Sequence, residues 1–376
     1  MERKLYKLVK KLAILYYRFL CLVLPVNQKR VVFDSSLGKS YAGNPKYIYE
    51  YLVANGYDIK WDCIWFYEKD KYNIPGMSRQ VQYGRMRYLY YMATAKIWVF
   101  DNRQPEFLIR RKDTYYIQTW HGTPLKKLAL DMEDVFMVGE TDINEYKKHF
   151  AKNVQTWDYL ISQNAFSSET FARAFDFHKK MLEIGYPRND ILFRDNNEEA
   201  IKRHKKMLGL PTDKKIILYA PTWRDNQMYR RGEYKFTLAM DLDRMQKEFG
   251  ADSVILLRTH YYIADMLDFS QYEGFVFNAS QYEDVSRLYL ASDLCITDYS
   301  SVFFDYANLK RPLLFFAYDY DAYADEIRGL YIDMEKELPG PILRTNEELV
   351  HALHHMDEIE EQYKQRYAEF YDRFCC

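Results

Sequence analysis

The sequence lacks the features that mark several common classes of protein. Its 376 residues include only five cysteines and no C-x-x-C pair, so a disulfide framework is not indicated and a reducing cytosolic compartment fits best. No H-E-x-x-H motif or Cys/His cluster indicates a zinc site. The formal net charge of -1 excludes electrostatic binding of nucleic acid by the chain as a whole.

Standard phosphate-binding motifs are missing as well. Residues 33–40, FDSSLGKS, end like a P-loop, but that pattern needs a glycine five residues before Gly38, where Phe33 stands. No G-x-G-x-x-G sequence follows an apolar strand pattern. A standard dinucleotide site is therefore not indicated.

A long apolar run is missing from the N-terminus, which is basic instead. Residues 12–24 are mostly apolar, Arg18 interrupts them, and lysines and arginines precede them. This run is shorter than the roughly 20 residues that span a bilayer, and no small-residue cleavage site follows it. We predict that residues 1–28 form a basic amphipathic helix that associates with the cytoplasmic membrane face. An ordinary helix docked on the protein body is the alternative.

Beyond residue 30, apolar strand patterns alternate with helical patterns, which predicts an α/β fold with mainly parallel sheets. A helix is expected at 44–57, with Asn44 as its cap. A polar helical stretch near residue 200 separates two Rossmann-like halves, so we predict domains at 29–195 and 196–355 and a C-terminal helix at 356–376. Strands are expected at 30–34, 58–67, 95–102, 113–120, 157–163, 216–223, 253–260, 275–279, 293–301 and 312–318.

The segment YIQTWHGTPLKKL, residues 116–128, places His121 between an expected strand and an expected helix. Thr123 would cap that helix, and Pro124 suits its first turn. The free N–H groups there would attract an anion, and Lys126 adds positive charge. A histidine at this point could take a proton from an attacking hydroxyl near neutral pH, whereas the alternative is a capping or core histidine. We expect the acceptor or the helix end to be supported by contacts from Gly122, Thr123 and Lys126.

Three strand ends of the second half carry polar groups suited to a nucleotide diphosphate. One expected strand ends at Arg258 and His260; arginine pairs with phosphate in a bidentate manner, and the histidine could donate to a phosphoryl oxygen. Ser300 or Ser301 could cap the next helix and bind phosphate, although serine also caps helices without any ligand. A surface ion pair is the alternative for Arg224 and Asp225. The candidate donor-binding residues are Arg224, Asp225, Arg258, Asp298, Ser300 and Ser301.

Six segments together resemble the CDP-glycerol glycerophosphotransferase family, the teichoic-acid primases and polymerases of Gram-positive bacteria. The resemblance implies a GT-B-like fold, with two Rossmann-like domains that face a cleft. The first domain would bind a membrane-linked acceptor and the second a CDP-linked donor. The segments, in family order, are GKSYAGNPKYIYEYL (38–52), QTWHGTPLKKL (118–128), YAPTWRD (219–225), LRTH (257–260), TDYSSVFFD (297–305) and RGLYIDMEKELPGPI (328–342).

The resemblance also implies a reaction. His121 would be the general base and His260 would steady the pyrophosphate or the transferred phosphoryl group, while glycerol phosphate passes from CDP-glycerol to a hydroxyl of a lipid-linked glycan and CMP leaves. We expect no tightly bound cofactor; a divalent metal could accompany the donor, but the sequence offers no acidic cage for it. The alternatives are a CDP-ribitol donor, a capsule acceptor, a GT-B sugar-nucleotide glycosyltransferase, and a non-catalytic nucleotide- or lipid-binding protein at the membrane.

Overall fold

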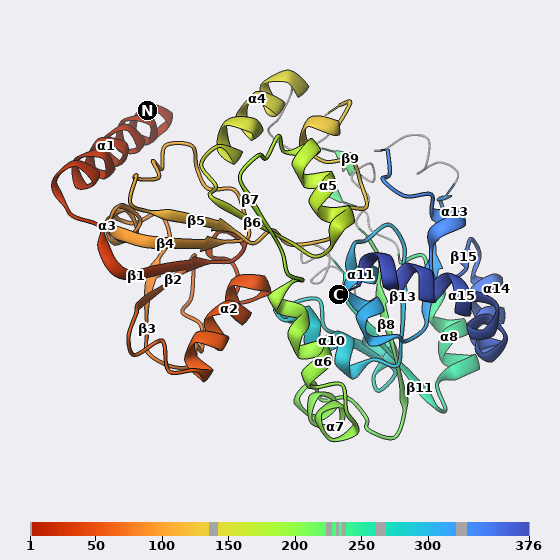
Figure 1. Cartoon of the computed structure of the whole chain (residues 1–376). Coiled ribbons are helices and arrows are strands. Elements are labelled where there is room, and N and C mark those ends of the chain that lie inside the picture. The colour runs from red at the N-terminus through yellow and green to blue at the C-terminus, as the bar shows by residue number, and fades with distance from the viewer. Residues whose placement is uncertain are drawn as a thin grey trace. The chain divides into compact units, whose positions relative to one another are not determined.

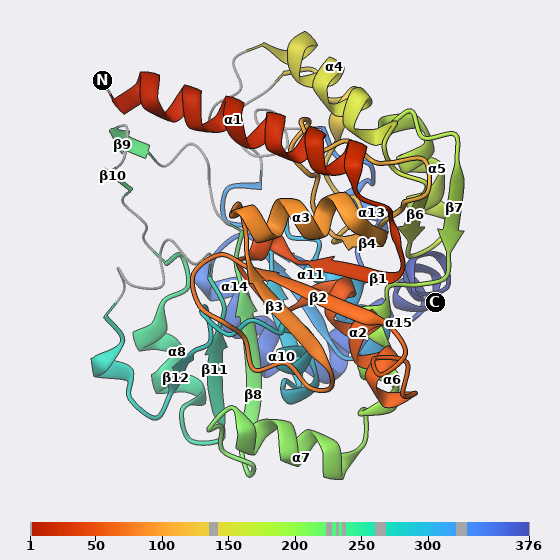
Figure 2. The same cartoon turned by 90° about the vertical axis from the view of Figure 1, so that its left-hand side faces the viewer.

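The described part of the chain divides into two compact units. A computed structural model of the protein describes residues 2–134, 142–222, 228–230, 233–234, 238–259, 268–320 and 329–375 (Figures 1 and 2). The first unit comprises Met1–His121, Asn144–Gln163 and Ser168–Arg188, and the second Gly122–Ile143, Asn164–Ser167 and Asn189–Cys376. The domain ranges expected from the sequence, 1–28, 29–195, 196–355 and 356–376, stay predictions.

The first unit is built on a seven-stranded parallel sheet in the order β3-β2-β1-β4-β5-β6-β7. Six of its strands follow the Rossmann order 3-2-1-4-5-6. The central strands are buried because helices cover both faces of a parallel sheet, which explains their continuous apolar runs. The strands are β1 (Asn27–Asp34), β2 (Asp62–Tyr67), β3 (Ser78–Gln82), β4 (Ala95–Phe100), β5 (Tyr115–Gln118), β6 (Tyr159–Ser162) and β7 (Lys180–Glu183).

Helices follow the strands of this sheet. The N-terminal helix α1 (Glu2–Val23) lies along α3 (Met86–Thr94), as Figure 2 shows. Helix α2 (Gly43–Ala54) begins after Ala42, so the prediction that Asn44 caps it is wrong. The remaining elements before the second sheet are η1 (Ser36–Gly38), η2 (Ala129–Asp131), α4 (Ile143–Val154), α5 (Ala165–Ala174), η3 (Pro187–Asn189), α6 (Asp190–Arg194) and α7 (Glu198–Met207).

The second unit repeats the strand order of the first in a six-stranded parallel sheet, β12-β11-β8-β13-β14-β15. Counted along the chain this is again 3-2-1-4-5-6, so the predicted α/β class with two Rossmann-like halves is confirmed. The strands are β8 (Lys215–Ala220), β11 (Ser253–Leu257), β12 (Val276–Asn278), β13 (Leu294–Thr297), β14 (Leu313–Phe316) and β15 (Ile342–Leu343), with a separate antiparallel pair, β9 (Met228–Arg230) and β10 (Glu233–Tyr234).

The C-terminal helix α15 (Met356–Phe374) packs on the rest of the second unit through aromatic rings. Phe370 is 2% exposed and packs on Phe303 and Phe304, and Phe374 also contacts Phe304. The other helices of this part are α8 (Leu242–Phe249), η4 (Ser270–Tyr272), α10 (Val285–Ala291), α11 (Val302–Tyr306), η5 (Ala307–Leu309), α13 (Met334–Glu337) and α14 (Asn346–His354).

Candidate active site

Each sheet has a topological switch point, which is where open α/β sheets bind ligands. The switch lies between β1 and β4 in the first unit and between β8 and β13 in the second. In both, an aspartate comes directly after the later strand. Asp101 Oδ1 accepts a hydrogen bond from the Ser36 N–H at 2.9 Å, and Asp298 Oδ1 accepts one from the Thr222 N–H at 2.8 Å. Each donor N–H lies two residues beyond the end of the neighbouring strand. The two units therefore have the same aspartate-to-backbone hydrogen bond at the switch point.

His121 lies at the first switch point, just beyond β5, with an exposed side chain. Its ring stacks on Trp120, with centroids 4.6 Å apart, and its Nδ1 lies 2.9 Å from the backbone carbonyl oxygen of Asp101. A carbonyl can only accept, so Nδ1 carries the hydrogen, and in the neutral ring Nε2 has the lone pair. This is the tautomer that a general base needs.

Asn44 holds the backbone of this loop, a role that the sequence analysis missed. Its side chain is fully buried and donates to the carbonyl oxygens of Thr119 at 3.0 Å and Trp120 at 3.1 Å. Its Oδ1 accepts from the Arg188 N–H at 3.2 Å, and Arg188 Nη1 donates to the carbonyl of His121 at 2.8 Å. These bonds join residues 67 to 144 positions apart, so no local sequence signal could have identified them.

Two buried carboxyl groups lie at the same switch point. Asp34 ends β1 and is 1% exposed, and Asp101 follows β4 and is 4% exposed. Burial, and next the charge of Asp101, raise the pKa of Asp34 from 3.8 to about 7. Burial also raises the pKa of Asp101, against the hydrogen bond from Ser35 and the charge of His121. The sequence analysis overlooked both groups.

The helix expected after His121 is not formed. Instead of turning into a helix at Thr123, the chain stays extended and makes an isolated antiparallel bridge between Lys126 and Leu330. The N–H groups of Lys127 and Tyr331 donate across this bridge at 2.8 and 2.9 Å. Since this backbone is already paired, the anion-binding helix end predicted at Thr123 is wrong.

Gly122 and Thr123 lie in the second unit, directly after His121 in the chain. A Cβ on Gly122 would lie 3.0 Å from Ser301 Oγ, so a larger residue there would displace the serine. Thr123 is 2% exposed, and within the described part of the chain its hydroxyl has no hydrogen-bond partner. A buried hydroxyl without a partner is costly, which makes it a candidate to bind a ligand.

The segment after β13 was predicted to cap the following helix and to bind phosphate, and the structure shows only a weak cap there. Asp298 is buried and also accepts from the Tyr299 N–H at 2.7 Å. Ser301 stands at the N-cap of α11, but its hydroxyl makes no capping bond, and Ser300 Oγ lies 3.5 Å from the Val302 N–H. The prediction that Ser301 caps the helix is therefore wrong, and a cap by Ser300 is weak at this distance. Both hydroxyls are half-exposed and remain candidates for binding phosphate.

Arg258 connects two loops of the second unit. Its Nη1 donates to the carbonyl oxygens of Ala279, at 3.0 Å, and of Tyr282, and burial lowers the pKa of the guanidinium. The next residue, Thr259, donates its N–H to Ser280 Oγ at 2.9 Å. Nη1 of Arg258 thus holds the loop at 279–282 in place, and phosphate binding by Arg258 stays a prediction. Arg224, Asp225 and His260 lie outside the described residues, and their roles stay predictions too.

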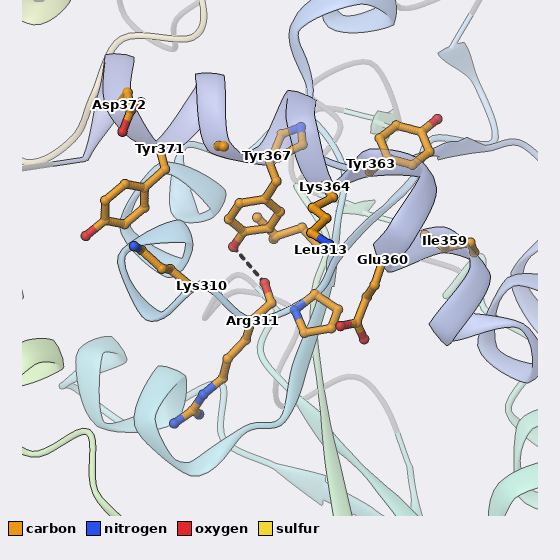
Figure 3. Close-up of a pocket in the computed structure, with 13 residues that line it drawn as sticks. Lys310, Arg311, Leu313, Ile359, Glu360, Tyr363, Lys364, Tyr367, Tyr371 and Asp372 are labelled. Atoms are coloured by element: carbon orange, nitrogen blue, oxygen red, sulfur yellow. Dashed lines mark hydrogen bonds between the residues drawn. The ribbon is translucent and has the colours of Figure 1, made fainter.

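No predicted site residue lines the cavity of about 290 Å³ shown in Figure 3. It lies between α15 and the segment 310–313, where Tyr367 donates to the Arg311 carbonyl oxygen at 2.7 Å. Leu313, which begins β14, lines it, whereas Asp298 follows the end of the parallel neighbour β13. The cavity is therefore at the opposite edge of the sheet from the predicted donor residues.

Metal-binding clusters and membrane-spanning helices are absent from the described residues. Within the described ranges, no three His, Cys, Asp or Glu side chains are grouped so that they could hold a metal ion. None of the helices described is long and apolar enough to cross a membrane. The expectation that a divalent metal would arrive with the donor stays a prediction.

Two Rossmann-type units, each with an aspartate at its switch point, define a GT-B-like α/β protein. The family model described as CDP-Glycerol:Poly(glycerophosphate) glycerophosphotransferase matches residues 15–376. The chain belongs to this family, which confirms the resemblance found in the sequence.

Similar proteins of known name support the same family. A teichoic acid poly(glycerol phosphate) polymerase of Bacillus subtilis (strain 168) is 46% identical over an alignment that covers 99% of this chain and 50% of that protein, so the chain spans about half the length of that relative. A teichoic acid glycerol-phosphate transferase of Staphylococcus aureus (strain NCTC 8325 / PS 47) is 43% identical over 93% of this chain and 89% of its own length. A structure of the wall teichoic acid polymerase TagF, a variant soaked with CDPG, is 44% identical with a TM-score of 0.91, covering 99% of this chain and 91% of that one.

The raised pKa of Asp34 predicts how stability depends on pH. The folded protein holds this proton up to about pH 7 and the unfolded chain releases it near pH 3.8, so stability falls as the pH rises between these values. Asp34→Asn removes this loss. We expect the variant to gain roughly 2 kcal/mol relative to the parent on going from pH 5 to pH 8, as measured by urea unfolding.

The matched control is Asp213→Asn, at an exposed carboxyl of the second unit. Its difference from the parent should be the same at both pH values. Equal pH dependence of Asp34→Asn and the parent would show that Asp34 ionises normally in the folded protein.

Proposed function

We propose that the chain transfers glycerol phosphate from CDP-glycerol to a hydroxyl of a lipid-linked acceptor and releases CMP, as a step of teichoic-acid synthesis. The observation that carries this proposal is His121, whose Nδ1–H is tied to the Asp101 carbonyl so that Nε2 is free to accept a proton. Family membership and the polymerase soaked with CDPG support the choice of donor.

The reaction is a displacement at the phosphorus that carries the glycerol. The acceptor hydroxyl oxygen forms a bond to this phosphorus, and the bond from phosphorus to the bridging oxygen breaks with its electron pair going to CMP. The hydroxyl proton passes to Nε2 of His121 and then to solvent. Positioning and charge stabilisation supply most of the rate in such transfers.

The second unit would bind the donor. Ser300, Ser301 and the buried Thr123 hydroxyl offer neutral donors for phosphoryl oxygens. In this proposal they act in one reaction with His121, as the family resemblance implies. Arg224 and Arg258 add positive charge toward the pyrophosphate. His260 steadies the pyrophosphate or the transferred phosphoryl group, as the family resemblance implies for this histidine.

The main test is CMP release by the purified protein. CDP-glycerol, CDP-ribitol and a UDP-sugar are offered in parallel, each with a lipid-linked disaccharide and with an acceptor that already carries glycerol phosphate. We expect release with CDP-glycerol. His121→Ala should lower turnover on the order of 10²- to 10⁴-fold, since the general base is lost.

His178→Ala is the control, because this histidine is a surface residue of the same unit. Release of CMP with CDP-ribitol alone would show that CDP-ribitol, and not CDP-glycerol, is the donor. Release of UDP alone would favour a sugar-nucleotide glycosyltransferase. A folded protein that binds CDP-glycerol without releasing CMP would leave the binding-protein alternative. A capsule acceptor would be indicated if only capsule-type oligosaccharides were extended.

Thr123 provides a second test of the donor site. Thr123→Val keeps the shape of the side chain and removes a buried hydroxyl that has no partner within the described ranges, so the free energy of unfolding should stay equal or rise. If the hydroxyl binds a phosphoryl oxygen, turnover should fall about 10-fold, the worth of one hydrogen bond to a charged group. Unchanged turnover would remove Thr123 from the site, and Thr123→Ser serves as the control that keeps the hydroxyl.

We also propose that α1 binds the cytoplasmic membrane face. Tyr17 and Leu20 dock this helix on the first unit, and the Tyr17 hydroxyl donates to the Ile109 carbonyl oxygen at 2.8 Å. A second row of apolar side chains, spaced three or four residues apart, stays exposed, as interfacial helices require. This row is Leu5, Leu8, Leu12, Leu15, Phe19 and Leu22, and the exposed basic side chains of the helix include Lys7, Lys10, Lys11 and Arg18.

Sedimentation with vesicles tests this proposal. Leu12→Glu and Leu15→Glu should each weaken binding to phosphatidylglycerol vesicles about 10-fold or more, since a buried leucine contributes roughly 1.5–3 kcal/mol. Ile59→Glu, at a residue 79% exposed elsewhere on the first unit, is the control. Equal binding of all variants, or no preference for anionic over phosphatidylcholine vesicles, would refute a membrane role for this row.

A further inference from the structure

We propose that the buried pair Asp34 and Asp101 positions His121 for proton transfer: Asp101 fixes the ring tautomer through its own carbonyl, and the negative charge of the pair stabilises the ring once it has accepted the proton. The inference rests on the proposed function, in which His121 is the base. It makes both aspartates positioning residues, since neither touches substrate.

The side chain of Asp101 fixes the orientation of its own backbone. Oδ2 accepts from the Ser35 hydroxyl at 2.6 Å, and Oδ1 accepts from the Ser36 N–H at 2.9 Å and from Asn102 Nδ2 at 2.8 Å. A Cβ on Gly43 would lie 3.3 Å from Oδ2, so the helix start packs closely on this carboxylate. With the side chain held from three directions, the carbonyl that receives the His121 Nδ1–H cannot turn away freely.

Asp34 adds a second buried acid that receives only neutral donors. Its Oδ1 accepts from the Gly38 N–H at 2.5 Å and its Oδ2 from Gln104 Nε2 at 3.1 Å. Within the described residues neither Asp34 nor Asp101 forms an ion pair with lysine or arginine. Above about pH 7, where Asp34 is ionised as well, the two like charges repel each other in this buried site, so a nearby positive charge is favoured there.

The other titratable groups around the pair do not supply that charge. Tyr88 and Tyr116 are buried and Tyr83 is half-buried. Burial raises the pKa of each phenol above its usual range, and the charge of Asp34 adds to this effect. The guanidinium of Arg188 bonds to the carbonyl of His121 itself and would disfavour a second positive charge on the ring. The negative charge of the carboxyl pair offsets this unfavourable effect of Arg188. A protonated His121 would in turn relieve the repulsion within the pair.

Two substitutions separate the two parts of the proposal. Asp101→Asn keeps the shape and most acceptors but removes the charge. Asp101→Ala also releases the backbone carbonyl. Asp58→Asn is the control, because Asp58 is 6% exposed in the same unit and accepts from the Met77 N–H at 2.7 Å, away from His121.

The first readout is nitrogen NMR of the full chain labelled with ¹⁵N-histidine, in which the His121 signal is the one lost in His121→Ala. The parent, Asp101→Asn and Asp58→Asn should show Nδ1 protonated and Nε2 unprotonated at pH 8. Asp101→Ala should show a mixture of both tautomers. A mixture in the parent, or an unchanged single tautomer in Asp101→Ala, would overturn the positioning role.

The second readout is the pH profile of CMP release. In Asp101→Asn the maximal rate should fall about 10-fold and the acidic limb should move to lower pH, because a negative charge near the base is lost. A rate loss without movement of this limb would mean that the charge does not act on the base. If the parent releases no CMP, the proposed function fails, while the NMR result still decides whether the pair sets the tautomer.

Discussion

The carboxyl edge of each sheet depends on one interaction, an aspartate that bridges the two strands at the switch point. Asp101 reaches the backbone beyond β1, and Asp298 reaches the backbone beyond β8. Each carboxylate is buried, which is tolerable only because several donors satisfy it. The bridge sets where both loops leave the sheet, so every candidate side chain on those loops depends on it.

The two units differ in what surrounds this shared bridge. The last residue of β1 is Asp34, whereas the corresponding last residue of β8 is Ala220. Among the described residues, the first unit therefore holds two carboxyl groups at its switch point, whereas the second holds Asp298 alone. A second buried carboxylate would repel a pyrophosphate but would favour a protonated histidine. This asymmetry agrees with a division in which the first unit supplies the base and the second receives the anionic donor.

Sequence patterns predicted the buried parts of the fold well because a central parallel strand needs a continuous apolar run. All ten expected strands are present, while β3, β7, β15 and the short antiparallel pair β9 and β10 were missed. The sequences of β3 and β7, SRQVQ and KMLE, are polar because edge strands are half exposed, and β15 has two residues. The helix expected at Thr123 failed for another reason: its local signals were sound, but the backbone pairs with residues near 330, about 200 positions away.

The same distinction applies to the candidate site. His121 could be found because a titratable residue stood between an apolar strand and a turn, but its supports, Asn44 and Asp101, act through backbone contacts that no motif encodes. Trp120 shows why such supports are needed. Its φ of +52° is unfavourable for a bulky side chain, by an amount of order 1–3 kcal/mol. The bonds from Asn44 and the packing of the indole on Phe171 and Phe175 hold the residue in this conformation. Strain that two other segments of the chain maintain, in the residue directly before the proposed base His121, is better explained by a demand of the chemistry than by a demand of the fold.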